Sequence, residues 1–221
     1  MLRELSAPNI GVLRNAIAPV FEGLAVNGKA THEPPMLAYT STPFRGLHIL
    51  LHAMPRISAL VPGIGLKVFS SMSLYHAESD PFEALYAWAR RSPGVAYSPA
   101  VGQAELAVAL RDVDVLAYPN IFDETSCIAM MEAMAAGCAV VTTRRGALPE
   151  TTGGAARLVE PDDDPRVLSA RFADAVAEEV GQRRSDPAAH TARIARQVAH
   201  VNDTMTWARR AEEWPAWLGT L

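Results

Sequence analysis

Residues 118–143, YPNIFDETSCIAMMEAMAAGCAVVTT, decide the fold of this chain, because a strand end, a loop, a helix and a second strand follow one another in them. The pattern predicts a helix over 126–136, and Gly137 is a natural left-handed stop for that helix. The apolar run 139–142 then predicts a buried strand. This order is typical of βαβ units and therefore of a parallel sheet.

Two acidic side chains stand at informative places in this stretch. Glu124 lies in the predicted loop, and Glu132 lies eight positions later on the predicted helix. In open α/β sheets, ligands bind beyond the carboxyl ends of the strands, where such loops lie. A carboxylate there accepts hydrogen bonds from hydroxyls of a sugar or a ribose, and a helix N-terminus suits a phosphate. The segment therefore contains the parts needed to hold a nucleotide sugar.

The alternation of β-rich apolar runs with helical patterns extends over the rest of the chain, so the fold class is α/β. We expect strands at 10–13, 36–40, 66–70, 95–97, 113–117, 139–142 and 157–159. We expect helices at 47–54, 103–111, 126–136, 167–179, 190–200 and 204–218, and one more that opens at residue 80.

Composition excludes several classes of protein. The chain has 221 residues with a formal net charge of −4, whereas a nucleic-acid-binding protein usually carries a basic excess. No apolar run approaches the roughly 18 residues of a membrane span, and residues 1–16 lack the apolar core of a signal peptide. Two cysteines, Cys127 and Cys138, and six scattered histidines predict neither a disulfide framework nor a metal site. We expect a cytoplasmic protein, with peripheral membrane association of the complete enzyme left open.

The segment with the two glutamates resembles a family signature. It is similar to the Glu-x7-Glu motif of the group 1, family-four retaining glycosyltransferases of the GT-B fold, in which L/M-E-A-M-A-x-G-x-P-V-V-x-T surrounds the second glutamate. Residues 131–143 here are MEAMAAGCAVVTT. The segment departs from the family pattern in two places: residues 125–127 are Thr-Ser-Cys where the family has Gly-Phe-Gly, and Ala139 stands in place of a proline.

The resemblance implies a domain organisation. It covers about residues 10–218 and indicates the C-terminal half of a GT-B enzyme, a Rossmann-like doubly wound parallel sheet with a helical C-terminal extension. We expect a lead-in over 1–9, a nucleotide-sugar-binding domain over 10–202 and a crossing helix over 203–221, which in the family packs back on the N-terminal domain. We expect that N-terminal, acceptor-binding domain to be absent from this chain.

The resemblance also implies the roles of individual residues. Residues 40–47, TSTPFRGL, are similar to the family's phosphate loop; Arg45 matches its lysine, whereas Thr40 stands where the family has an arginine. Arg45 and Glu124 are the implied catalytic residues, which face the donor diphosphate and hold hydroxyls of the donor sugar. The implied donor-binding residues are Thr42, Thr125, Ser126 and Cys127 at the diphosphate, and Glu132 at the ribose.

The resulting hypothesis is a retaining hexosyltransferase that uses a nucleoside-diphosphate sugar as donor and needs no other cofactor and no metal. The acceptor, a glycan, a lipid or a small molecule, stays open. Two alternatives remain: a non-catalytic nucleotide-sugar-binding or structural module, and another sugar-nucleotide enzyme of the same fold, such as an epimerase. The sequence argues against a Rossmann oxidoreductase, because no G-x-G-x-x-G follows a strand.

Overall fold

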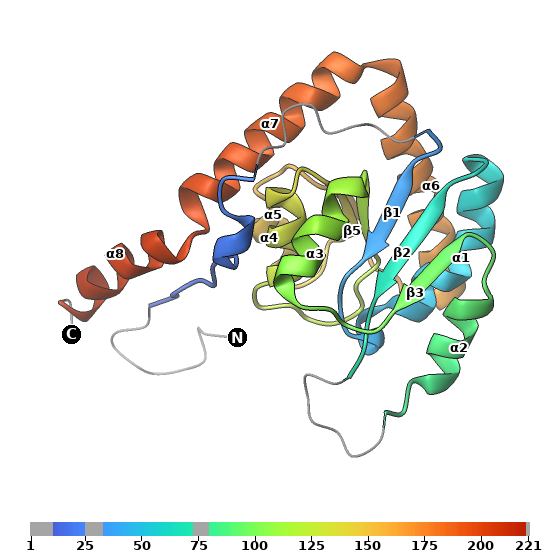
Figure 1. The fold of residues 1–221 in the computed structure, drawn as a ribbon, viewed down its shortest axis with the longest axis horizontal. Coiled ribbons are helices and arrows are strands. Elements are labelled where there is room, and N and C mark those ends of the chain that lie inside the picture. The colour runs from blue at the N-terminus through green and yellow to red at the C-terminus, as the bar shows by residue number, and fades with distance from the viewer. Residues whose placement is uncertain (1–10, 25–32, 73–79, 220–221) are drawn as a thin grey trace.

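A six-stranded parallel sheet forms the centre of the computed structural model, which describes residues 11–24, 33–72 and 80–219 (Figure 1). The strand order is β3-β2-β1-β4-β5-β6, the Rossmann order, so the predicted fold class is confirmed. The strands are β1 (Met36–Tyr39), β2 (Gly65–Phe69), β3 (Val95–Ser98), β4 (Val115–Tyr118), β5 (Ala139–Thr143) and β6 (Arg157–Val159).

Helices cover both faces of this sheet. Figure 1 shows α3, α4 and α5 on one side and α1, α2 and α6 on the other. Every residue of β4 and β5 is buried, as expected for central strands of a parallel sheet that helices cover on both faces. The helices are α1 (Leu47–Leu60), α2 (Glu83–Arg91), α3 (Gln103–Ala109), α4 (Ile128–Ala135), α5 (Leu148–Thr152), α6 (Pro165–Ser185), α7 (Pro187–Thr204) and α8 (Trp207–Leu218), with 3-10 turns at Pro19–Phe21, Pro43–Arg45 and Leu110–Asp112.

The strand predicted at 10–13 is wrong for the part that the structure describes. Residue 10 lies outside the described residues, and 11–18 adopt no regular structure. Ala16 and Ile17 are buried, and the Ile17 N–H donates to the carbonyl of Met205, at the end of α7, at 2.8 Å. The described part of the segment thus pairs with no strand, and its apolar side chains differ: Val12 is 66% exposed, whereas Ala16 and Ile17 are buried.

The helix of the Glu motif begins later than predicted. The prediction placed its start at Ser126, but α4 begins at Ile128, after Cys127 in an extended conformation. Its end agrees with the sequence, because Gly137 has a φ of 75°, in the left-handed region that favours glycine. Residues 125–127 therefore form the approach to the helix and not its first turn.

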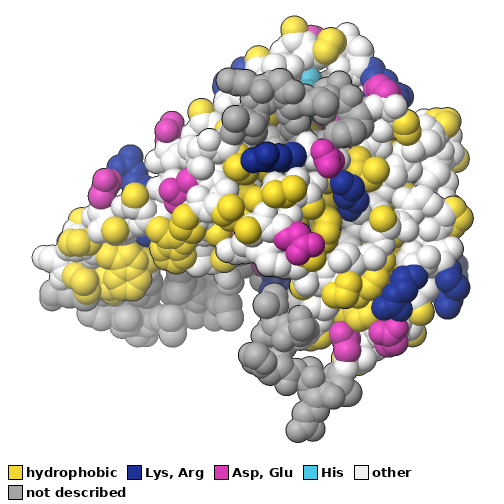
Figure 2. All heavy atoms as spheres, viewed as in Figure 1, with side chains coloured by type: hydrophobic (Ala, Val, Ile, Leu, Met, Phe, Trp, Pro, Cys, Tyr) yellow, Lys and Arg dark blue, Asp and Glu magenta, His cyan; other side chains and the backbone are white. Residues whose placement is uncertain are grey.

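Helices α7 and α8 extend beyond the edge of the sheet (Figure 1), and the predicted boundary at 202/203 falls inside α7. The division into lead-in, domain and crossing helix stays a prediction. Helix α8 exposes Trp207, Trp214 and Leu218, and Figure 2 shows hydrophobic side chains gathered along it. Among the described residues, no helix has both the length and the apolar character needed to span a bilayer.

Candidate functional site

A pocket of about 300 Å³ lies where the loops after β1, β2 and β3 meet the start of α4. We call it the α4 pocket. It has the place that ligand sites take in open α/β sheets, beyond the carboxyl ends of the strands. Of the predicted donor-site residues, four line it: Thr42, Arg45, Ser126 and Cys127. The other lining residues are Thr40, Ser41, Phe69, Ser71, Ala100, Ile128 and Ala129.

The α4 pocket contains polar atoms that the protein does not satisfy. Within the described residues, the buried Oγ1 atoms of Thr40 and Thr42 and the buried Nε of Arg45 have no hydrogen-bond partner. Each such atom costs about 1–3 kcal/mol of stability when nothing bonds to it. Arg45 is also the only charged side chain among the lining residues. The pocket therefore suits a ligand with negative charge and several oxygen atoms.

The start of α4 adds to this character. Its N-cap, Cys127, makes no side-chain capping hydrogen bond, and the first turn contains no acidic residue. The first N–H groups of a helix have no partner inside the helix and carry the positive end of its dipole. Ile128 and Ala129, in the first turn, both line the pocket. The backbone and Arg45 thus present positive potential to the same space.

Arg45 and Glu124 form an ion pair at the edge of the pocket. The Arg45 Nη1 donates to Glu124 Oε1 at 2.5 Å, and the Tyr118 hydroxyl donates to the same oxygen at 2.6 Å. The Arg45 guanidinium also lies 5.5 Å from the centre of the Phe44 ring and 4.8 Å from that of Phe122. Burial opposes the charge of Arg45, but the Glu124 carboxylate raises its pKa above the ordinary value. Arg45 therefore stays charged at every physiological pH.

The network around Glu124 goes beyond what the sequence indicated. The Glu motif predicted a carboxylate that faces a donor sugar, whereas Glu124 is only 5% exposed and does not line the α4 pocket. Tyr118 and Phe122 were not singled out as functional, although both lie within six residues of Glu124. Burial raises the pKa of Tyr118 far above its ordinary value, so the hydroxyl keeps its proton and remains a donor.

Glu132 is buried in a different environment. It is 3% exposed, and Gln103 at the start of α3 donates to its Oε1 at 3.1 Å. Burial raises the pKa of Glu132 to about 7, against the opposing effect of a hydrogen bond from the backbone of Ala18. The side chain does not line the α4 pocket. The carboxyl group is therefore close to half-ionised at neutral pH.

Residues 125–127 divide between two pockets. Cys127 and Ser126 line the α4 pocket, whereas Thr125, together with Ser126, lines a second pocket of about 500 Å³ near α5, the α5 pocket. Asn15, Glu150 and other side chains from the start of the chain, α5, α7 and α8 complete its lining. Burial raises the pKa of the Cys127 thiol to about 12, so this group is neutral and a poor nucleophile.

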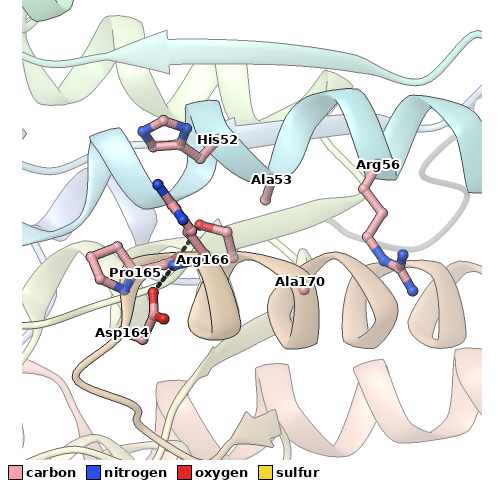
Figure 3. A pocket seen from close by; sticks show the side chains of 8 residues that line it. His52, Ala53, Arg56, Asp164, Pro165, Arg166 and Ala170 are labelled. Carbon is pink, nitrogen blue, oxygen red and sulfur yellow. Dashed lines mark hydrogen bonds between the residues drawn. The ribbon is translucent and has the colours of Figure 1, made fainter.

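A third pocket, of about 450 Å³, lies between α1 and α6 on the opposite side of the sheet (Figure 3). We call it the α1–α6 groove. Two of its charged groups have partners: Asp164 accepts from the N–H of Arg166 and caps α6, and Arg56 pairs with Asp174 at 2.7 Å. No cluster of three His, Cys, Asp or Glu side chains that could hold a metal occurs in the described part of the chain.

Comparison with known proteins identifies the family of this chain. A family profile described as "Glycosyl transferases group 1" matches residues 36–178, more than half of the chain. The chain belongs to the group 1 glycosyltransferases. The matched residues include β1 to β6 and α1 to α5, so the whole sheet and the α4 pocket lie in the part that defines this family.

Two curated relatives of this glycosyltransferase are mannosyltransferases. The chain is 33% identical over 130 residues to the MMP α-(1→4)-mannosyltransferase of Mycolicibacterium hassiacum, an alignment that covers 58% of this chain and 30% of the relative. It is 31% identical over 134 residues to the phosphatidyl-myo-inositol mannosyltransferase of Mycobacterium tuberculosis, with 60% and 33% covered. The matched part is thus about a third of each of these relatives.

Solved structures confirm that the fold is one half of GT-B. Sucrose-phosphate synthase from Thermosynechococcus elongatus superposes with a TM-score of 0.71 at 21% identity, over 99% of this chain and 55% of that one. The Anabaena protein HepE, solved in complex with UDP, gives a TM-score of 0.66 at 15% identity, over 94% and 56%. This group 1 glycosyltransferase chain therefore spans about half the length of these structures.

Proposed function

We propose that this chain binds a nucleoside-diphosphate sugar in the α4 pocket and supports transfer of the sugar to an acceptor with retention at the anomeric carbon. One observation carries the proposal: Thr40, Thr42 and Arg45, whose buried polar atoms lack partners in the described structure, line the same pocket as the uncapped start of α4. A diphosphate supplies the negative charge and the acceptor oxygens that these groups lack.

The chemistry follows from where charge develops. Cleavage of the bond between the sugar and the diphosphate builds negative charge on the leaving group, and donors that already point at that charge lower the barrier. Arg45 and the N–H groups at the start of α4 are such donors. Glu124 would fix the sugar through its hydroxyls and Glu132 the ribose, which is a positioning role. The relatives are longer than this chain, and a general base is not assigned within it.

The donor sugar is a hexose in this proposal, with mannose as the first candidate. The two curated relatives named above are mannosyltransferases, and they share about a third of their aligned residues with this chain. The chain matches only about a third of each of these relatives, and nothing in the matched part assigns the acceptor. We therefore propose only a class, a hydroxyl-bearing glycan, lipid or small molecule.

The deciding experiment is calorimetric titration of the chain with GDP, UDP and their mannose and glucose conjugates. We expect one of the two diphosphates to bind, and we expect Arg45→Gln to weaken that binding strongly. Arg56→Gln is the matched control, because Arg56 is a half-exposed arginine that pairs with a carboxylate in the α1–α6 groove. Wild-type protein that binds neither diphosphate would refute the proposal.

Specific observations favour one second candidate, a module that binds the donor without turning it over. Thr40 stands where the family has an arginine, and Cys127, at the cap of α4, stands where it has a glycine. Both changes remove features that serve the diphosphate. Binding of the nucleotide sugar with no hydrolysis and no transfer to any acceptor, even after the partner half from a relative is supplied, would favour this candidate.

A further inference from the structure

Two donors share one oxygen of Glu124. The carboxylate Oε1 accepts from Arg45 at 2.5 Å and from the Tyr118 hydroxyl at 2.6 Å. Glu124 is 5% exposed and Tyr118 2% exposed, so water contributes little to the stabilisation of this carboxylate. Removing one partner of a buried charge is costly unless another group compensates for it. The two donors therefore decide where the Glu124 carboxylate can lie.

The two donors differ in how firmly they are held. Tyr118 is the last residue of β4; its ring packs 5.8 Å from that of Tyr39, and its carbonyl accepts from Thr142 at 2.8 Å. Arg45 lies on the 3-10 turn Pro43–Arg45, and 22% of its side chain is exposed. One donor is thus fixed to the sheet, and the other stands on a turn at the rim of a pocket.

Arg45 cannot serve Glu124 and a diphosphate equally well. Its Nη1 is engaged by Glu124, while its buried Nε, which has no partner among the described residues, belongs to a side chain that lines the α4 pocket. A guanidinium has two edges that can bind a phosphate in the two-pronged way, Nε–Nη2 and Nη1–Nη2. Because the Arg45 Nε is buried, a phosphate that takes the other edge competes with Glu124 for Nη1. After such an exchange, Tyr118 is the donor that still holds the Glu124 carboxylate.

We infer that Tyr118 is the positioning residue that holds Glu124 toward the donor sugar, and that Arg45 passes from Glu124 to the donor diphosphate on binding. The inference rests on the proposed function and adds two things to it. It assigns a role to a tyrosine outside the Glu motif, and it makes the Arg45–Glu124 ion pair a feature of the free state. Binding of the diphosphate then frees the carboxylate for the sugar hydroxyls.

The test compares the affinity of the chain for a nucleoside diphosphate with its affinity for the corresponding nucleotide sugar. Their ratio measures the contribution of the sugar. Tyr118→Phe removes only the hydroxyl; we expect it to lower this ratio about tenfold, the usual effect of a lost hydrogen bond to a charged group, and to leave diphosphate affinity within about twofold. Tyr86→Phe is the matched control, because the Tyr86 hydroxyl also donates to a carboxylate, that of Asp80, at 2.9 Å, and neither residue lines the α4 pocket.

A second variant tests the exchange of Arg45. Glu124→Gln removes the charge that holds Arg45 in the free state, so we expect diphosphate affinity to rise severalfold while the ratio for the sugar falls. In the double variant with Tyr118→Phe, the ratio should fall no further than with Glu124→Gln alone, because Tyr118 acts through Glu124. A purely structural tyrosine would weaken both ligands together.

The outcomes separate this inference from the proposed function. Wild-type protein that binds neither ligand refutes both. If Tyr118→Phe binds the diphosphate and the ratio of nucleotide-sugar to diphosphate affinity is unchanged, the role of Tyr118 is refuted and the proposed function stands. Diphosphate affinity that stays constant or falls in Glu124→Gln refutes the exchange of Arg45. Should Tyr118→Phe fail to fold, as circular dichroism would reveal, Glu124→Gln still decides the exchange.

Discussion

The α4 pocket and the α1–α6 groove are both lined by polar and basic side chains, yet they differ in how these groups are satisfied. In the groove, Asp164 caps the helix and Arg56 has its own carboxylate. In the α4 pocket, the helix start has no side-chain cap, and Thr42 Oγ1 and Arg45 Nε are buried without a partner among the described residues. Groups with protein partners indicate a structural role, whereas buried groups without a partner indicate a ligand.

The largest expected difference between the α4 pocket and the α1–α6 groove comes from substituting one arginine in each of them. Arg45→Gln should weaken binding of the nucleoside diphosphate about 100-fold, because a charge-assisted contact to phosphate in a partly buried site is lost. Arg56→Gln should leave affinity unchanged, since Arg56 lies in the groove. Titration calorimetry measures both. Equal losses in the two variants would mean that general charge, and not the α4 pocket, attracts the ligand.

Glu132 is a buried carboxyl group that, unlike the unpartnered atoms of the α4 pocket, accepts a hydrogen bond from Gln103. Its folded pKa of about 7 lies above the ordinary value of 4.5, so the unfolded chain loses the proton first as pH rises. The wild-type free energy of unfolding should therefore fall by about 2 kcal/mol between pH 4.5 and 7 relative to Glu132→Gln, and change little above that range. Urea unfolding at pH 5 and pH 8 checks this; parallel pH profiles of the two proteins would contradict it.

For the α1–α6 groove we predict an effect on stability and none on ligand binding. Asp164→Ala removes a capping hydrogen bond to the N–H of Arg166, so the free energy of unfolding should fall by about 1 kcal/mol. Nucleotide affinity should not change, because the residue stands far from the α4 pocket in the lining of the groove. Asp164→Asn, which retains a capping oxygen, is the control and should recover most of the stability.

The smallest effect distinguishes two buried threonines. Thr143 donates to the carbonyl of Asn120 at 2.6 Å, whereas the Thr42 Oγ1 has no partner within the described structure. Thr143→Val should destabilise the free protein by about 1 kcal/mol, while Thr42→Val should be neutral or slightly stabilising and should weaken diphosphate binding. Thermal unfolding of the two variants tests the sign; a destabilised Thr42→Val would show that this hydroxyl is satisfied in the free protein.

Much of the fold was predictable because local patterns carry it. The buried runs around Val140 and Leu116 predicted central strands, and Gly137 predicted the end of α4. The segment from residue 11 misled the prediction, because a short apolar run such as Val12 and Leu13 is typical of a buried strand, whereas Val12 is exposed in the structure. The start of α4 was also placed two residues early, since Ser126 is a good cap in sequence but Cys127 occupies the cap in the structure.

The candidate site was predictable only in part. The sequence nominated Thr42, Arg45, Ser126 and Cys127, which the fold brings to one pocket from two distant loops. It gave no sign that Arg45 would pair with Glu124, or that Tyr118 would donate to the same oxygen. Thr125 was expected with its two neighbours but lines the α5 pocket instead, and Ser126 lines both pockets.

By itself, the sequence determined the parallel α/β sheet, the family and the residue types available for a donor site. These depend on periodicity, on glycine and on a contiguous motif, all of which are local. Only the tertiary structure decided which polar atoms are buried without a partner and which carboxylate holds which cation. Burial and pairing depend on residues that are distant in the chain, such as Arg45 and Glu124. A carboxylate in water is stabilised by the solvent, whereas the buried Glu124 carboxylate depends on the two donors that contact it, Arg45 and Tyr118.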